Sequence, residues 1–169
     1  KTFDYNQVFS NLETISIPNY GLFESYANRD SLHYKKKYNL FDAKTIVRGT
    51  LRKVGFAKAW DVFVNLGMTS ESINNKLIDE KVFNSYIEGL NDSDIKSKMD
   101  YLDLFNTKYY NKKYSPFEHL LNALQDKWAL ETDDVDMIVM QHKFEYIMNN
   151  KSQSLILSMV VKGDDNYHT

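Results

Sequence analysis

Cysteine is absent from this chain of 169 residues. Its absence excludes disulfide bonds, cysteine-based zinc sites and cysteine nucleophiles within these residues. A chain without cysteine is compatible with a reducing compartment, and we expect a cytoplasmic protein. The four histidines, at positions 33, 119, 142 and 168, do not have the spacing of a zinc-binding helix, so we expect no metal site.

Glycine is scarce, and long apolar runs are missing. The six glycines, at positions 21, 49, 55, 67, 89 and 163, nowhere form a G-x-G-x-x-G motif or a phosphate-binding loop. No apolar run approaches the roughly 20 residues that cross a bilayer, and we expect no signal peptide at Lys1. We therefore expect no nucleotide-binding half in this chain and no membrane partner.

Charge of one sign does not dominate the chain either. Its 21 basic and 23 acidic residues are interspersed and give a formal net charge of −2, so composition predicts no nucleic-acid partner. The length suits one domain with its own core. Because the chain begins without methionine and its last strand pattern runs directly into residues 163–169, we expect both ends to be cut from a longer protein.

The apolar patterns predict an α+β fold with a mixed, largely antiparallel β-sheet. Strands are predicted over residues 21–26, 44–52, 136–148 and 154–161, with a polar hairpin loop at 149–153. His142 lies on the apolar face of one of these strands, and we expect a hydrogen-bonded core histidine there.

Helical patterns predict an α-helical sub-domain inserted at roughly residues 55–130. One helix is predicted from Phe56 to a C-cap at Gly67, and two more are expected between Glu80 and Asn106. The clearest signal is Ser115-Pro116-Phe117-Glu118, a capping box with proline at the first helical position.

Two arginine-bearing segments indicate a site for a small molecule with several carboxylates. The first contains Arg29, and the second, Arg48-Gly49-Thr50-Leu51-Arg52, follows about twenty residues later. Alternation along an extended strand would place Arg48, Thr50 and Arg52 on one face. Guanidinium forks bind carboxylates bidentately, and threonine adds a hydroxyl donor beside them.

A structural interpretation of these arginines also fits, and their spacing alone favours it. They could form ion pairs with Glu24, Asp30 or Asp42 that serve only the fold. Periodicity alone does not distinguish the two interpretations.

The same segments resemble those of a known family. Tyr26-Ala27-Asn28-Arg29-Asp30-Ser31 resembles the Y-P-N-R-D-S segment of saccharopine dehydrogenases of the glutamate-forming type, with Ala27 in place of proline. The segment from Ile46 to Phe56 is similar to the family's L-L-R-G-T-L-R-Y-K-G-Y run, with Lys53-Val54 replacing its Tyr-Lys. The segment from Asp136 to Glu145 is similar to the strand after the family's helical region. The similarity spans most of the chain except about residues 69–114.

The resemblance implies that residues 1–169 are the C-terminal, substrate-binding domain of an NADP-dependent saccharopine dehydrogenase. Such an oxidoreductase of lysine metabolism and amino-acid biosynthesis interconverts saccharopine with glutamate and aminoadipate semialdehyde. NADP would be bound by a Rossmann domain that is absent from this chain, so the chain alone is expected to be inactive. By matching positions, Arg29 and Arg52 would clamp substrate carboxylates. Thr50 would donate from its hydroxyl or backbone, and Leu51 would act through its main chain.

Two other functions stay open. A related imine-reducing enzyme, such as carboxynorspermidine dehydrogenase, would act on a substrate with fewer carboxylates and more ammonium groups, and would need fewer arginines and more acidic residues. Alternatively, the domain is a non-catalytic oligomerisation module, which predicts an exposed apolar sheet face. A homodimer through the sheet is compatible with either enzyme.

Overall fold

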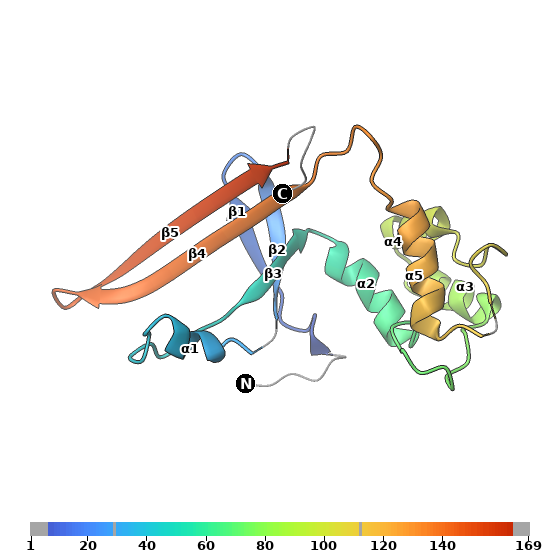
Figure 1. The fold of residues 1–169 in the computed structure, drawn as a ribbon, viewed down its shortest axis with the longest axis horizontal. Helices are drawn as coiled ribbons and strands as arrows, with labels where there is room; N and C mark the ends of the chain where they lie inside the picture. Colours follow the sequence, from blue (N-terminus) through green and yellow to red (C-terminus); the bar gives the residue numbers. More distant parts are fainter. Residues whose placement is uncertain (1–6, 29, 112, 164–169) are drawn as a thin grey trace. The chain divides into compact units, whose positions relative to one another are not determined.

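The computed structural model describes residues 7–28, 30–111 and 113–163, which form two compact units. The first unit holds residues 10–54 and 131–163, with strands β1 to β5 and helix α1. The second is built on Gly55–Leu130, with helices α2 to α5 (Figure 1). The described strand pairs are all antiparallel. These features confirm the predicted α+β class and the helical insertion at residues 55–130.

Three strands of the first unit form a sheet in the order β1, β2, β3. They are β1 (Glu13–Ile17), β2 (Gly21–Ala27) and β3 (Gly49–Lys53). β1 is an addition to the strands that the sequence predicts. β3 is shorter than predicted and begins at Gly49 instead of Lys44. The reason is that Ala27, the last residue of β2, pairs with Gly49, so β3 begins where its partner ends.

The other two strands form a long hairpin, β4 (Met137–Met148) and β5 (Lys151–Lys162). Met148 pairs with Lys151, so only Asn149 and Asn150 form the turn. Their φ angles, 52° and 60°, lie in the left-handed region, as type I′ hairpin turns require. The predicted five-residue loop at 149–153 is therefore wrong, because two asparagines are enough to reverse the chain.

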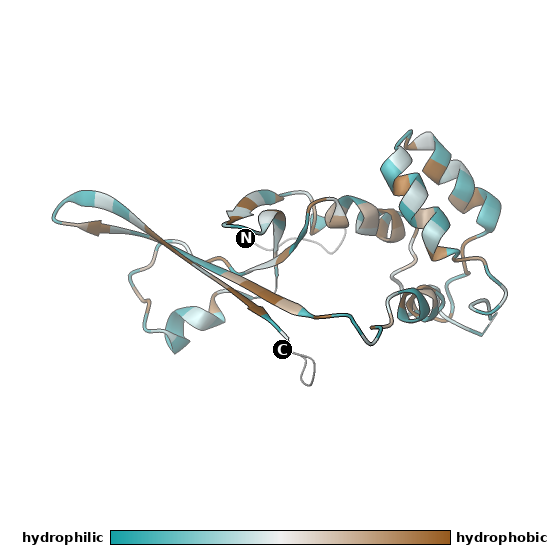
Figure 2. Cartoon of the chain, turned by 90° about the horizontal axis from the view of Figure 1, so that it is seen from above, coloured by the Kyte–Doolittle hydropathy of each residue, from teal (hydrophilic) through white to brown (hydrophobic). Residues whose placement is uncertain are grey.

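One face of the hairpin is apolar, and we call it the outer face. Its cross-strand pairs are Ile138 with Val161, Met140 with Met159, His142 with Leu157, and Phe144 with Leu155. The apolar side chains stay well exposed, from 39% for Met140 to 51% for Leu157. Hydrophobic colouring runs along much of both strands (Figure 2). On the opposite face, Gln141 donates to Ser16 O of β1 over 3.3 Å.

His142 is exposed, so the prediction of a core histidine is wrong. Its ring stacks on Phe144 with centroids 6.1 Å apart, and its Nε2 lies 3.0 Å from Met140 Sδ. The strand alternation was predicted correctly, but alternation alone does not say whether a face is covered.

The described residues of the second unit form four helices around a shared core. They are α2 (Phe56–Asn65), α3 (Glu80–Gly89), α4 (Ser93–Leu102) and α5 (Pro116–Lys127). Phe63, Met68 and Leu120 are among the fully buried core side chains. The predicted capping box is confirmed. Ser115 Oγ accepts from the Glu118 N–H over 3.2 Å, and the Ser115 N–H donates to Glu118 Oε2 over 2.7 Å.

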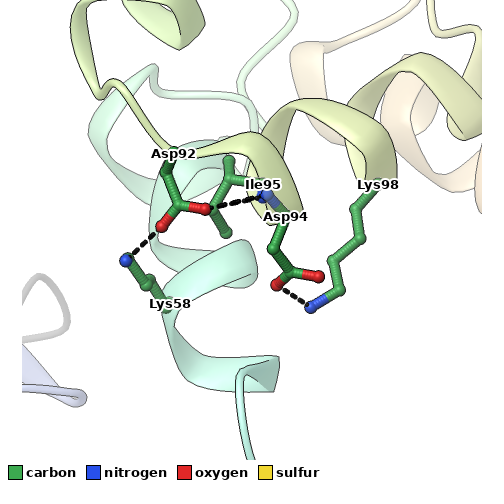
Figure 3. A network of polar contacts seen from close by, with 5 residues as sticks. All are labelled: Lys58, Asp92, Asp94, Ile95 and Lys98. Carbon is green, nitrogen blue, oxygen red and sulfur yellow. Dashed lines mark hydrogen bonds and ion pairs between the residues drawn. The ribbon is translucent and has the colours of Figure 1, made fainter.

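Asp92 joins α4 to α2 through both of its carboxylate oxygens (Figure 3). Oδ1 accepts from the N–H groups of Asp94 and Ile95, over 3.0 and 3.1 Å, which caps α4. Oδ2 forms an ion pair with Lys58 of α2. The hydrogen bond from Lys58, followed by the Ile95 N–H, lowers the pKa of Asp92 below its ordinary value of 3.8.

Candidate functional site

The register of β2 and β3 places Thr50 and Arg52 on one face of the three-stranded sheet. Thr50 pairs with Tyr26, and Arg52 pairs with Glu24. Residues directly opposite each other in an antiparallel pair share a face, so we call these four residues the polar face. Leu51 lies between Thr50 and Arg52 on the opposite face, which leaves its main chain as the part nearest to a ligand of the polar face.

Glu24 gives the polar face a buried carboxylate. Its side chain is 7% exposed, whereas Arg52 is exposed and donates from Nη1 to Leu51 O over 3.3 Å. A buried charge is costly unless other groups compensate it, and the register puts an arginine at the opposite position. The register therefore places Arg52, which is exposed and can reach a ligand, directly opposite Glu24, which is buried.

Three hydrogen bonds connect the segment after β2 to the start of β3, and we call them the brace. The Asn28 N–H donates to Arg48 O over 3.0 Å. Asn28 Nδ2 donates to Thr50 Oγ1 over 2.8 Å, and the Arg48 N–H donates to Ser31 Oγ over 2.9 Å. The brace fixes the backbone on both sides of Gly49 and holds the Thr50 hydroxyl.

Arg48 is held by an aromatic partner. Its Nη1 donates to Tyr34 Oη over 2.9 Å, and its guanidinium carbon lies 5.2 Å from the centre of the Tyr34 ring. Tyr34 belongs to α1 (His33–Lys37), a short helix that buries none of its side chains.

The structural ion pairs that the sequence left open are not seen for Arg48. Among the described residues, no carboxylate forms an ion pair with it. Asp30 instead accepts from the Leu32 N–H over 2.8 Å, which closes the loop after β2.

Arg29 lies outside the described residues. The expectation that Arg29 and Arg52 open onto one surface therefore stays a prediction. The residues on either side of it, Asn28 and Asp30, are held by hydrogen bonds to Thr50, Arg48 and Leu32.

The chemistry available on the polar face is recognition by ion pairs and hydrogen bonds. Within the described ranges, no group of three histidine, aspartate or glutamate side chains could hold a metal ion, and no helix is long and apolar enough to cross a membrane. The described strands pair only antiparallel, which differs from the parallel βαβ unit of a dinucleotide site. The polar face can thus bind and orient a charged small molecule.

Sequence reasoning named Thr50, Leu51 and Arg52 as candidate substrate-binding residues but gave no role to Asn28. Asn28 stands inside the Y-A-N-R-D-S segment, beside Arg29. Its contact with Thr50 joins residues 22 positions apart, and only the pairing register of β2 and β3 brings them together. Glu24 could have been singled out from strand alternation, because it lies two residues before Tyr26.

The family comparison matches the whole chain. The model of the saccharopine dehydrogenase C-terminal domain matches residues 1–169. The saccharopine dehydrogenase (NADP(+), L-glutamate-forming) of Schizosaccharomyces pombe is 28% identical over 176 residues, which cover 87% of this chain and 39% of that protein. The mitochondrial alpha-aminoadipic semialdehyde synthase of Bos taurus is 51% identical over 45 residues, which cover 27% of this chain and 5% of that protein.

A solved structure shares the fold. The apo histidine-tagged saccharopine dehydrogenase (L-Glu forming) from Saccharomyces cerevisiae matches with a TM-score of 0.75 at 21% identity, over 96% of this chain and 42% of that one. The chain thus spans well under half the length of these relatives. Because the family model matches every residue, the chain belongs to the saccharopine dehydrogenase C-terminal domain family.

Proposed function

We propose that this chain is the substrate-binding part of an NADP-dependent, glutamate-forming saccharopine dehydrogenase. The observation that carries the proposal is the polar face, where Thr50 and Arg52 share one side of the sheet and the brace holds Thr50. Family membership supports the same conclusion. The domain that binds NADP would belong to the remaining part of the complete enzyme.

The polar face suits saccharopine, which joins lysine to the five-carbon skeleton of glutamate through a secondary amine and carries three carboxylates. Arg52 would bind one carboxylate bidentately, and Arg29 another. The Thr50 hydroxyl would donate beside them. The reduced cofactor NADPH, bound elsewhere in the complete enzyme, would supply the hydride for the imine of glutamate and aminoadipate semialdehyde, and NADP+ would accept the hydride when saccharopine is oxidised. The residues of this domain hold the carboxylates and so fix where the imine carbon lies.

Kinetics of the complete enzyme, with its nucleotide-binding domain restored, test this proposal. We expect Arg52→Ala and Arg29→Ala each to lower kcat/KM for saccharopine by about 10- to 100-fold, since each removes hydrogen bonds to a charged group. Lys53→Ala is the matched control. Lys53 is the next cationic residue of β3, lies on the opposite face and should leave kcat/KM unchanged.

Two results would contradict the proposal in different ways. If both arginine variants keep the wild-type kcat/KM, Arg29 and Arg52 do not bind the substrate carboxylates. A wild-type enzyme that does not turn over saccharopine would remove the substrate assignment. The 169-residue chain alone should show no turnover, because the NADP+ that accepts the hydride from saccharopine would be bound by the other domain.

The second enzyme assignment, carboxynorspermidine dehydrogenase, is an alternative outcome of the same assay, since the polar face holds one acidic residue, Glu24, opposite Arg52. Comparing kcat/KM for saccharopine and carboxynorspermidine in the wild-type enzyme decides between the two substrates.

The outer face of the hairpin supports a second, compatible function, and we propose that it pairs two copies of the enzyme as a homodimer. Four consecutive cross-strand pairs keep their side chains exposed there, and all but His142 are apolar. Contiguous apolar patches of this kind are uncommon on monomers and mark interaction surfaces. The same face would be self-complementary across a two-fold axis.

A further inference from the structure

We propose that Asn28 is a positioning residue that orients the Thr50 hydroxyl as a donor to a substrate carboxylate. This inference rests on the proposed function of the polar face. It assigns a role to the Asn28 side chain, which lies beside the predicted substrate-binding residues but is not one of them.

The geometry of the pair determines which way the hydroxyl proton can point. Asn28 Nδ2 donates to Thr50 Oγ1 over 2.8 Å. A hydroxyl has one proton to donate and two lone pairs to accept with. Since the amide uses a lone pair, the Thr50 proton is left for another acceptor. A carboxylate accepts hydrogen bonds and cannot donate them, so it is the matching partner.

Asn28 is itself fixed before any substrate arrives. Its backbone N–H donates to Arg48 O over 3.0 Å, directly after Ala27 pairs with Gly49 at the end of the ladder. Thr50 is half-buried in β3, and its branched β-carbon restricts the first side-chain torsion. Both ends of the hydrogen bond are therefore held in place, which lowers the entropy that binding must remove.

Two substitutions of Asn28 separate this role from simple packing. Asn28→Asp keeps the size and shape of the side chain, but an ionised carboxylate only accepts. It would take the Thr50 proton for itself and place a negative charge near the substrate carboxylate. Asn28→Ala removes the donor and leaves the hydroxyl free to rotate.

The test is a double-mutant cycle in the complete enzyme, measured as kcat/KM for saccharopine. We expect Asn28→Ala to lower it about fivefold through a higher KM, and Asn28→Asp to lower it about 30-fold. In a Thr50→Val background, Asn28→Ala should have no further effect, because the hydroxyl that it orients is gone. Thr50→Ser, which keeps the hydroxyl but loses the branched β-carbon, should retain more kcat/KM than Thr50→Val, and the KM for NADP should not change.

Asn65→Ala is the matched control. Asn65 also donates a side-chain hydrogen bond, to Asp61 over 2.9 Å, but it lies in α2 and should leave kcat/KM unchanged. Thermal unfolding midpoints of wild type and Asn28→Asp show whether the isosteric variant is folded.

The inference is overturned if Asn28→Ala causes the same fold-loss with Thr50 and with Val at that position. It is also overturned if folded Asn28→Asp matches wild type. Absence of saccharopine turnover in the wild type is a different failure. That result would contradict the proposed function, and with it this inference. It requires only the measurement on the wild-type enzyme, so it is distinguished from a failure of the Asn28 variants.

Discussion

Gly49 controls how closely β3 can approach β2 beside Thr50. A Cβ added to Gly49 would lie 2.5 Å from Ser25 Oγ and 3.0 Å from Tyr26 O. The serine hydroxyl can rotate away, but the carbonyl belongs to the backbone ladder. We therefore expect Gly49→Ala to destabilise the 169-residue chain by about 1–3 kcal/mol, as overpacking does. Urea unfolding with amide hydrogen exchange of the β2 and β3 peptides measures the effect.

Gly89→Ala is the control for that substitution. A Cβ on Gly89 would meet nothing within 4 Å, and the residue lies at the end of α3. Alanine there should leave stability unchanged or raise it slightly. Adding Ser25→Ala to Gly49→Ala should restore only part of the loss, because the Tyr26 carbonyl stays in place. An unfolding midpoint equal to that of the wild type for Gly49→Ala would contradict the prediction, because β2 and β3 would then accommodate the added Cβ without loss of stability.

Single residues also show what the sequence could and could not predict about the site. Strand alternation placed Thr50 and Arg52 on one face and Leu51 on the other, but it did not supply the other two residues of the polar face, Glu24 and Tyr26. The brace could not be predicted from the sequence, because the Asn28 side chain contacts Thr50 only after β2 and β3 have paired in one register. Arg48 was grouped with the strand, yet it lies one residue before β3 and contacts Tyr34 of α1.

At the scale of helices and strands, the most reliable predictions came from motifs whose residues interact within a few positions of one another. The capping box at Ser115 and Glu118 predicted the start of α5 because both partners lie within one turn of helix. The turn at Asn149 and Asn150 was placed in too long a loop, because a polar cluster does not reveal which of its residues already pair with the facing strand. β1 was missed because its five residues include only two apolar side chains, Ile15 and Ile17, which is a short alternation to recognise.

The link between α2 and α4 makes an element-scale prediction about acid. The pKa of Asp92 is lowered, chiefly by Lys58 and then by the Ile95 N–H, so the unfolded chain binds more protons than the folded chain under acidic conditions. This stabilisation is present above the ordinary value of 3.8 and is lost as the pH falls through the lowered pKa. Asp126, whose pKa is lowered chiefly by Lys108, acts in the same direction. Asp92→Asn should therefore weaken the acid dependence without abolishing it.

Urea unfolding of the 169-residue chain at several acidic pH values, followed by the helical circular dichroism signal, measures this change. Asn keeps the side-chain oxygen that caps α4, so helix content at neutral pH should be preserved. Lys58→Met should reproduce most of the effect, and the double variant should add little. The change is expected to be small because the Lys58 side chain is 67% exposed. Identical acid profiles for wild type and Asp92→Asn would contradict the assignment.

At the scale of the whole molecule, similarity to known proteins and the pattern of apolar residues predicted different parts of the fold. The motif resemblance left out about residues 69–114, whereas the family model matches the whole chain and the solved relative covers 96% of it. The helical unit in that stretch was still predicted, because α3 and α4 place Phe83, Ile95 and Met99 at helical spacing in one core. A core of this kind requires apolar side chains of suitable size more than it requires identity.

Oligomeric state is the prediction that belongs to the whole molecule. Leu157 lies on the outer face and is 51% exposed, while its neighbour Ile156 lies on the opposite face and is 54% exposed. If the outer face pairs two copies, Leu157→Arg buries an unpaired charge and should raise the dimer dissociation constant of the complete enzyme at least about tenfold. Sedimentation over a range of concentrations measures that constant.

Ile156→Arg introduces the same charge at a similarly exposed position and should leave the dimer intact. A wild-type enzyme that sediments as a monomer would remove the homodimer altogether. A dimer that Ile156→Arg weakens as much as Leu157→Arg would place the contact elsewhere on the hairpin. Because the two residues are adjacent on one strand and differ chiefly in the face they occupy, the comparison isolates the contribution of the outer face from any general effect on β5.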